Sequence, residues 1–259
     1  MSQIWDTKIQ LMKLILMFCI SITLVSLNAC SQSRESRQPV GGSCEGCKAV
    51  FESPVPFEKL SWEDTLPDYN EPGPKMIISG VVYHADGKTT AKDVVLYIYH
   101  TGQDGEYKNR NNEQGWAKRH GDIRGWMKTN EKGQYRFYTL KPASYPNSNA
   151  LKHIHPVIKE PGKNEYYIDE FIFDDDPFLT PEIRKQPLEN RGGNGIIKLI
   201  IENGIQQGER NIYLGKNIPN YPLSKKTPTP KTTEIVLSPS NETPFIISAL
   251  IPHWESINL

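Results

Sequence analysis

The sequence lacks a net charge of either sign. Its 259 residues carry 30 Lys and Arg against 30 Asp and Glu. Nucleic-acid-binding proteins usually present a basic face that neutralises phosphates, and a balanced composition gives no sign of one. We therefore expect no nucleic-acid partner.

Cysteine is also scarce, with four residues in the whole chain. Cys44 and Cys47 form a single CxxC, and no second CxxC exists to complete a zinc site with four thiolates. No βαβ pattern surrounds the pair, as a thioredoxin-like redox motif would require. A disulfide, a redox pair and half of a zinc site are the alternatives. The disulfide between Cys44 and Cys47 is the prediction.

Long apolar runs are absent except at the N-terminus, where Leu11 to Leu27 is largely apolar. Asn28-Ala29-Cys30 and a polar stretch follow, which resembles the lipobox of bacterial lipoproteins. Residues 1–30 are thus predicted to be a lipoprotein signal segment, with translation starting at Met1 or Met12 and Cys30 lipidated. The protein would be extracytoplasmic and lipid-anchored to a bacterial membrane, in the periplasm or at the cell surface. A transmembrane anchor is the alternative, although the run is only about long enough to cross a bilayer.

No long helical region is readable, and short strands separated by turn residues dominate residues 74–222. This pattern predicts a mainly β fold, an antiparallel β-sandwich. Gly80 could mark a bulge in the first strand, and Thr180 with Pro181 predicts the start of a short helix within 177–186. The expected strands are Met76–His84, Val94–His100, Gly125–Thr129, Gln134–Leu140, Lys152–Lys159 and Glu165–Phe173, and Ile196–Glu202 with Arg210–Leu214 is expected to form a closing hairpin.

Two further segments flank the predicted sandwich. Residues 31–73 form a tether and lead-in that contains the CxxC pair. Residues 223–259 begin with a Pro- and Thr-rich stretch, which is unlikely to pack, and form a C-terminal tail.

The segment Tyr145–Pro156 holds the strongest chemical signal in the chain, since it contains a tyrosine and an HxH pair. In a strand, side chains two residues apart point to the same face, so His153 and His155 would project together. Imidazoles bind zinc, copper, iron and nickel, and a nearby phenol adds an anionic oxygen ligand. The pattern indicates a metal site, against the alternative of two surface histidines on an edge strand.

Three stretches resemble the intradiol ring-cleavage dioxygenases, the family of catechol and protocatechuate dioxygenases. They are GVVYHADGKTTAKDVVLYIYHTGQDGEY at 80–107, RGWMKTNEKGQYRFYTLKPASYP at 124–146, and HIHP from His153. The family pattern places a GxY motif, a YP motif and then HxH in this order. The resemblance covers about residues 74–177.

The resemblance implies a β-sandwich with a mononuclear non-haem Fe(III) cofactor. By match to the motifs, its ligands would be Tyr107, Tyr145, His153 and His155, and Tyr145 would also act as the base that receives a substrate proton. The implied reaction opens the ring of a catechol-type aromatic diol with O₂ to give a muconate-type diacid, as in aromatic compound catabolism.

The chain departs from the family pattern near the first histidine. Ala150 stands where the family carries an arginine that stabilises negative charge on the substrate ring. Lys152 or Arg124 would be the substitutes for that cation. Glu170 falls near the position of a family glutamine, and an acidic residue there disfavours carboxylated catechols. The missing arginine favours the alternative function, a non-catalytic surface β-sandwich that binds a partner and retains only the fold.

Overall fold

The computed structural model describes residues 38–109, 113–185 and 189–222. The predicted signal segment with Cys30 and the predicted tail lie outside these residues. Among the described residues, no helix has the length and hydrophobicity needed to cross a bilayer.

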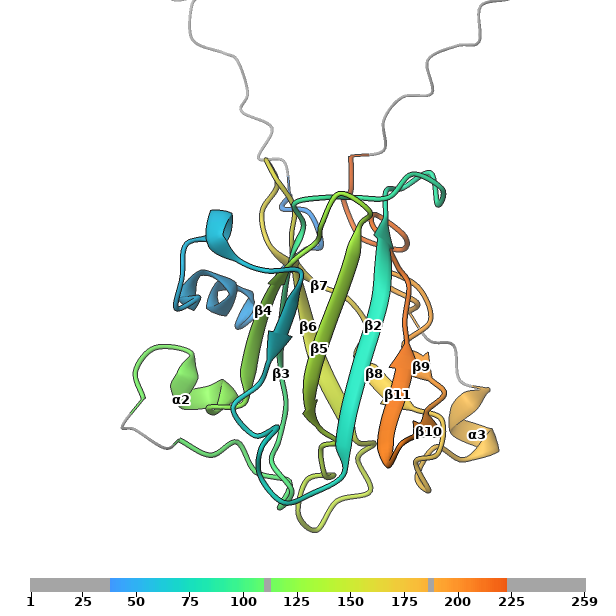
Figure 1. The fold of residues 1–259 in the computed structure, drawn as a ribbon. Coiled ribbons are helices and arrows are strands. Elements are labelled where there is room, and N and C mark those ends of the chain that lie inside the picture. Colours follow the sequence, from blue (N-terminus) through green and yellow to red (C-terminus); the bar gives the residue numbers. More distant parts are fainter. Residues whose placement is uncertain (1–37, 110–112, 186–188, 223–259) are drawn as a thin grey trace, which may run out of the picture. The chain divides into compact units, whose positions relative to one another are not determined.

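The first sheet is mixed and runs in the order β1-β5-β2-β11-β10, with β12 beside β2 (Figure 1). Its long central pair is antiparallel, from Lys75 opposite Leu140 to Val81 opposite Gln134. The strands are β1 (Glu63–Thr65), β2 (Lys75–Tyr83), β5 (Gln134–Leu140), β10 (Ile200–Glu202), β11 (Ile205–Glu209) and β12 (Ile212–Tyr213).

The second sheet runs in the order β4-β3-β6-β8-β9, with β7 beside β6. Strand β3 lies antiparallel to both β4 and β6 at the centre of this sheet. The strands are β3 (Val95–Tyr99), β4 (Arg124–Lys128), β6 (His153–Lys159), β7 (Tyr166–Tyr167), β8 (Phe171–Phe173) and β9 (Ile196–Ile197).

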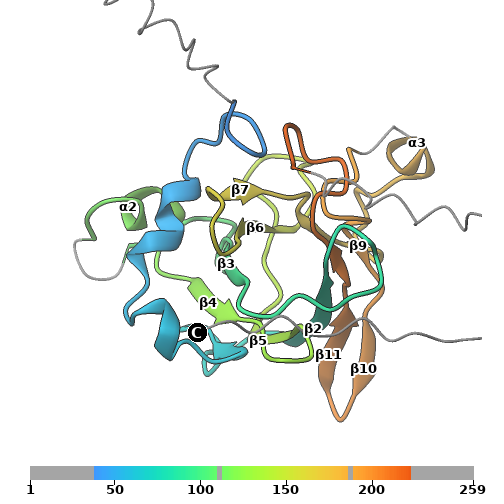
Figure 2. The same cartoon turned by 90° about the horizontal axis from the view of Figure 1, so that it is seen from above.

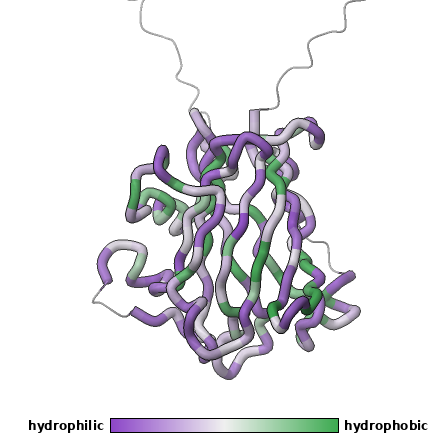
Figure 3. Tube along the Cα trace, in the orientation of Figure 1, coloured by the Kyte–Doolittle hydropathy of each residue, from purple (hydrophilic) through white to green (hydrophobic). Residues whose placement is uncertain are grey.

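The two sheets pack face to face, which confirms the predicted mainly β sandwich (Figure 2). Alternating residues of both sheets meet in the main core, for example Ile78 on β2, Phe137 on β5 and Ile154 on β6. Hydrophobic segments accordingly concentrate on the strands, and the loops are mostly polar (Figure 3). The sheets are less purely antiparallel than predicted, because β1, β9, β11 and β12 each join a neighbour in parallel.

A second, smaller core covers the outer face of the second sheet. The 3₁₀ turn η1 (Cys47–Glu52) places Cys47, Ala49 and Val50 against Tyr97 and Trp126. The lead-in also supplies η2 (Phe57–Lys59) and β1, which pairs with β5. The fold therefore begins earlier than the predicted boundary at residue 74, because the lead-in buries apolar side chains of its own.

The predicted closing hairpin is wrong in its second strand. The hairpin at Asn203-Gly204 joins β10 to β11, which is Ile205–Glu209 and not the expected Arg210–Leu214. Ile212 is fully buried and β12 pairs with β2 instead, because its apolar side chain fills the main core.

Of the short helices, α2 (Ala117–His120) was not predicted, and α3 (Pro181–Arg184) begins as expected, with the Thr180 hydroxyl accepting from Ile183 N–H at 3.4 Å.

Gly80 is not a bulge, since it lies in regular register opposite Tyr135. A Cβ atom at this position would lie 1.9 Å from the carbonyl oxygen of Arg210. The glycine is therefore required because the backbone at Arg210, between β11 and β12, lies directly against β2 at this position.

Replacing Gly80 with Ala should lower the free energy of unfolding by about 1–3 kcal/mol, because the added methyl group forces two backbones apart. Urea denaturation of Gly80→Ala and wild-type protein measures the difference. Ser79→Ala, one residue away on the less buried face of β2, should change it by less than about 0.5 kcal/mol. Equal losses in both variants would contradict this explanation.

Candidate functional site

Strand β6 presents its two histidines on the outer face of the second sheet, away from the main core. Ile154 between them is fully buried in that core, whereas Val157, two residues after His155, belongs to the outer core. The predicted alternation along HIH is therefore confirmed, and both imidazoles lie on the outer face of the second sheet rather than between the sheets.

Two loops bring the tyrosines to these histidines. Tyr107 follows β3 and Tyr145 follows β5, so the two phenols come from different sheets of the sandwich. The loops touch at Gly105, which has φ of +78°, and a Cβ there would lie 2.0 Å from the carbonyl oxygen of Ser144. Glycine is required at this contact, both for the left-handed conformation and for the close approach.

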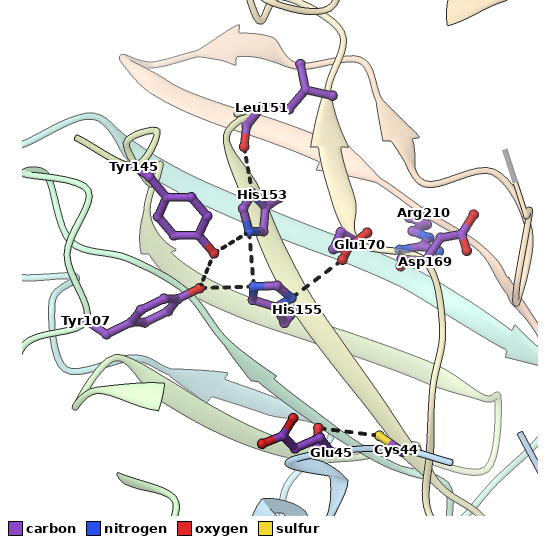
Figure 4. Close-up of polar contacts among 10 residues, drawn as sticks. All are labelled: Cys44, Glu45, Tyr107, Tyr145, Leu151, His153, His155, Asp169, Glu170 and Arg210. Atoms are coloured by element: carbon purple, nitrogen blue, oxygen red, sulfur yellow. Dashed lines mark hydrogen bonds and ion pairs between the residues drawn. The ribbon is translucent and has the colours of Figure 1, made fainter. Parts of the chain in front are cut away.

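The polar atoms of the four predicted ligands converge at one point (Figure 4). The Tyr107 and Tyr145 hydroxyl oxygens are 2.9 Å apart, and the Tyr145 oxygen is 3.1 Å from Nε2 of His153. Nε2 of His153 is 3.0 Å from Nε2 of His155, which is in turn 3.0 Å from the Tyr107 oxygen. The structure thus unites four residues that are spread over 48 positions of the chain.

The orientation of His153 is set from outside the cluster. Its Nδ1 lies 2.6 Å from the carbonyl oxygen of Leu151, which can only accept a hydrogen bond. Nδ1 must therefore carry the proton and donate, which leaves the Nε2 lone pair directed at the Tyr145 hydroxyl and at Nε2 of His155. A fixed tautomer of this kind is typical of a metal-binding histidine.

Two side chains of the site, His155 and Tyr107, are held in uncharged form by their surroundings. Burial lowers the pKa of His155 to about 3, and the neighbouring His153 adds to the shift. Burial also raises the pKa of the Tyr107 phenol well above its ordinary value, as does its hydrogen bond to Tyr145. Neutral imidazoles bind metals, but a phenol needs a cation nearby before it loses its proton. The Tyr107 phenol would thus become charged only with a cation bound beside it.

The cluster fits a first-row transition-metal ion. Bonds from such an ion to imidazole nitrogen or oxygen are about 2.0–2.2 Å long, so neighbouring ligands at right angles lie roughly 3 Å apart. The four edges of the cluster, 2.9 to 3.1 Å, match that separation. Within the described part of the chain, no three His, Cys, Asp or Glu side chains group together, so metal binding here depends on the phenols.

Glu170 reaches this site because of an irregularity between β7 and β8. Three residues, 168–170, lie opposite His155 and Pro156 on β6, which interrupts the single strand predicted for 165–173. Pro156 has no N–H to donate, so a bulge at this point loses no hydrogen bond. A Glu170 carboxylate oxygen is placed 3.7 Å from Nδ1 of His155, as expected from its alignment with the family glutamine.

The cation expected to replace the family arginine is not supplied by Arg124. Its guanidinium donates to Glu52 at 2.8 Å and lies over the Trp126 ring. Ala150 carries no charge, and its backbone N–H donates to the Ser148 hydroxyl. The charged group that lies beside the cluster is instead acidic, the Glu170 carboxylate near His155.

Three aromatic side chains that sequence reasoning did not assign to the site support His155. The Tyr99 ring stacks on His155 with centroids 4.6 Å apart, and on its other face stacks on His120 at 3.7 Å. Nδ1 of His120 is 2.8 Å from the buried Tyr97 hydroxyl. The β3 alternation predicts that Tyr97 and Tyr99 share a face, but no sequence signal predicts that Tyr99 lies opposite His155.

The disulfide loop closes one side of this aromatic stack. Cys44 and Cys47 are bonded, and a Cβ at Gly46 between them would lie 2.8 Å from Nε2 of His120. A cavity of about 200 Å³ lies between this loop and β6, with His155 and Glu170 in its lining.

Stability should fall in acid because of His120, whose pKa burial lowers to about 4. The unfolded chain then binds one more proton than the folded chain between about pH 6.5 and 4, so unfolding becomes easier as pH falls through that window. The contribution is at most about 1.4 kcal/mol per pH unit. Chemical denaturation of metal-free protein at pH 6.5 and 5.5 should show a smaller pH dependence in His120→Gln than in wild type. An identical dependence would show that His120 is already charged in the fold.

Comparison with known proteins supports these observations. A family model described as "Dioxygenase" matches residues 56–191, more than half of the chain. No curated protein matches the chain.

Among solved structures, the chain is similar to the dioxygenase domain of a dioxygenase carbohydrate-binding protein fusion from Streptomyces sp. SirexAA-E. The two chains are 18% identical, the match covers 62% of this chain and 94% of that chain, and the TM-score is 0.44. It is also similar to catechol 1,2-dioxygenase from Acinetobacter sp. ADP1, with 18% identity, 64% and 61% covered, and a TM-score of 0.47. An intradiol ring-cleavage dioxygenase from Tetranychus urticae matches with 21% identity, 62% and 90% covered, and a TM-score of 0.44. The match spans about three fifths of the Acinetobacter enzyme.

The residues matched by the family model include both tyrosines and both histidines of the cluster. The chain belongs to the intradiol dioxygenase family.

Proposed function

We propose that this protein is a non-haem Fe(III) intradiol dioxygenase that cleaves the ring of a catechol-type aromatic with O₂. The observation that carries the proposal is the convergence of two phenol oxygens and two imidazole nitrogens within 2.9 to 3.1 Å of their neighbours. Four such donors from three separate segments serve no evident packing purpose.

The donor types suit a ferric ion in particular. Two phenolates offset much of the charge of Fe³⁺, and two neutral imidazoles complete the set without adding charge. Tyr107, Tyr145, His153 and His155 would hold the ion. When bound, ferric iron would supply a Lewis acid that draws both catechol oxygens into the site.

Tyr145 is the residue we assign to proton transfer. Its hydroxyl contacts both Tyr107 and His153 and belongs to a partly exposed side chain, so an incoming diol can reach it. As a phenolate it would accept a proton from a catechol hydroxyl. In the overall reaction the bond between the two hydroxylated carbons breaks, both atoms of O₂ enter the product, and a muconate-type diacid forms.

The proposed substrates are catechols without a carboxylate on the ring. Glu170 places an acidic group beside His155, and Ala150 supplies no positive charge to offset a second anion. Like charges at this distance repel, so a carboxylated catechol would bind less well than an uncharged one.

Iron binding provides the first test. Purified protein reconstituted with Fe(III) should be visibly coloured by charge transfer from tyrosinate to iron, with one ion bound per chain. Tyr145→Phe should shift or weaken the band, since it removes one phenolate ligand. Tyr138→Phe is the matched control, because Tyr138 hydrogen-bonds to Glu63 on the other sheet and should leave the band unchanged.

If the protein is coloured, oxygen uptake with a panel of catechols tests turnover. A colourless, iron-free protein after reconstitution would instead favour the second candidate, a non-catalytic β-sandwich that binds a partner. The observation in favour of that candidate is Ala150 in place of the family arginine. Coloured protein without oxygen uptake on any catechol would leave metal binding in place and remove the proposed reaction.

We further propose that the enzyme is extracytoplasmic and anchored to a bacterial membrane through a lipid on Cys30. The support is the apolar run of 11–27 followed by Asn28-Ala29-Cys30 and a polar segment. The disulfide Cys44–Cys47 agrees with an oxidising compartment.

Lipidation can be tested by growing expressing bacteria with a radiolabelled fatty acid. Wild-type protein should incorporate the label and fractionate with membranes, and Cys30→Ser should do neither. Cys19→Ser, inside the predicted signal segment, should still be labelled. Label retained in Cys30→Ser would disprove the assignment.

A further inference from the structure

Three buried side chains form a hydrogen-bonded chain that the proposed reaction does not use. They are Asp68 from the lead-in, Thr139 on β5 and His100 directly after β3, exposed by 3%, 0% and 1%. Nε2 of His100 lies 2.7 Å from the Thr139 hydroxyl oxygen, which lies 2.9 and 3.1 Å from the two Asp68 carboxylate oxygens. The backbone N–H of Leu140 also donates to Asp68, at 3.1 Å.

Counting hydrogens shows that this chain holds one extra proton. Nδ1 of His100 lies 2.8 Å from the carbonyl oxygen of Thr101, so Nδ1 must donate. The single hydrogen of the Thr139 hydroxyl can satisfy either His100 or Asp68, but not both. With a neutral imidazole and an ionised carboxylate, one of the two short contacts would join two lone pairs in a buried site. Either His100 or Asp68 must therefore carry one more proton.

The two acid–base groups share that proton as a pair. Burial lowers the pKa of the His100 imidazole, and the nearby Asp68 carboxylate opposes this effect. The chain is thus electrically neutral as a whole, which is the form that a dry interior favours.

The network is joined to both loops that carry the tyrosines. Thr101, next to His100, donates its hydroxyl hydrogen to the carbonyl oxygen of Ala143 at 2.7 Å. The N–H of Ala143 donates in turn to the carbonyl oxygen of Gly102 at 3.3 Å. Tyr107 and Tyr145 follow these two segments directly, so the contacts set the spacing of the loops from behind.

We propose that Asp68, Thr139 and His100 are positioning residues that share one buried proton and thereby hold the loops of Tyr107 and Tyr145 together. The iron-binding consequence of this inference rests on the proposed function. The effect on the loops does not, because it is a property of the metal-free protein.

The test compares hydrogen exchange in metal-free protein for two threonine variants. Thr139→Val keeps the size of the side chain and removes the hydroxyl from the network. Thr129→Val is the matched control, since Thr129 is 2% exposed and also makes two hydrogen bonds, to Ala91 and Val94, outside the site. Amides in 101–107 and 143–145 should exchange on the order of tenfold faster in Thr139→Val, and at the wild-type rate in Thr129→Val.

Replacement of Asp68 tests the shared proton itself. In Asp68→Asn, the amide N–H can donate to Thr139 while the amide oxygen accepts from Leu140, so the chain is complete with a neutral His100. Asp68→Asn should therefore retain wild-type exchange in both loops, whereas Asp68→Leu should accelerate it. Equal acceleration in Asn and Leu variants would overturn the inference. If Thr139→Val does not fold, this pair gives the same comparison.

Iron titration separates this inference from the proposed function. If wild-type protein binds Fe(III), Thr139→Val should bind it more weakly, by the factor by which the fraction of protein with its loops held together falls. Failure of wild-type protein to bind iron would refute the proposed function. The exchange results would still show whether the network holds the two loops together. Loop exchange that is equal in Thr139→Val and Thr129→Val would refute the network, whatever the iron affinity.

Discussion

This structure depends on one constraint. Four polar side-chain atoms must lie together at a place where the protein offers them almost no other hydrogen-bond partners. The polar atoms of Tyr107, Tyr145, His153 and His155 each lie 2.9 to 3.1 Å from their neighbours in the cluster. Buried polar groups need such partners, and a ring of them holds only if its backbones cannot move apart. The surrounding fold meets this need with a rigid strand, β6, under the histidines and two tightly joined loops behind the phenols.

Rigidity comes from elements that are not themselves ligands. Tyr99 packs between His155 and His120, and the disulfide loop lies against the far side of His120. Gly105 lets the Tyr107 loop approach Ser144 at a distance that no other residue permits. Together these contacts hold the four side chains in a geometry that suits a small cation, so binding would need little rearrangement. The same surroundings carry the Glu170 carboxylate beside His155, which under the proposed function would disfavour carboxylated catechols.

Much of the candidate site was predictable because it is encoded locally. The HxH spacing predicts two imidazoles on one strand face, and the burial of Ile154 confirms it. Thr180 and Pro181 predict the start of α3 because caps act within one turn. The sequence predicted strand pairing wrongly where more than one segment could pair with the same strand. Residues 205–209 and 210–214 both follow the Asn203-Gly204 turn, and only burial of Ile212 in the main core decides which of them pairs with β10.

By itself the sequence determined the mainly β class, the four donor residues and the absence of an arginine at position 150, since these follow from residue type, alternation and motif order. Tertiary structure alone decided which side chains support the donors. Tyr99 meets His155 through the register of β3 on β6, and Asp68 reaches Thr139 from 71 positions away. Such contacts depend on how sheets pair and pack, and one strand's pattern carries no information about its partner's register.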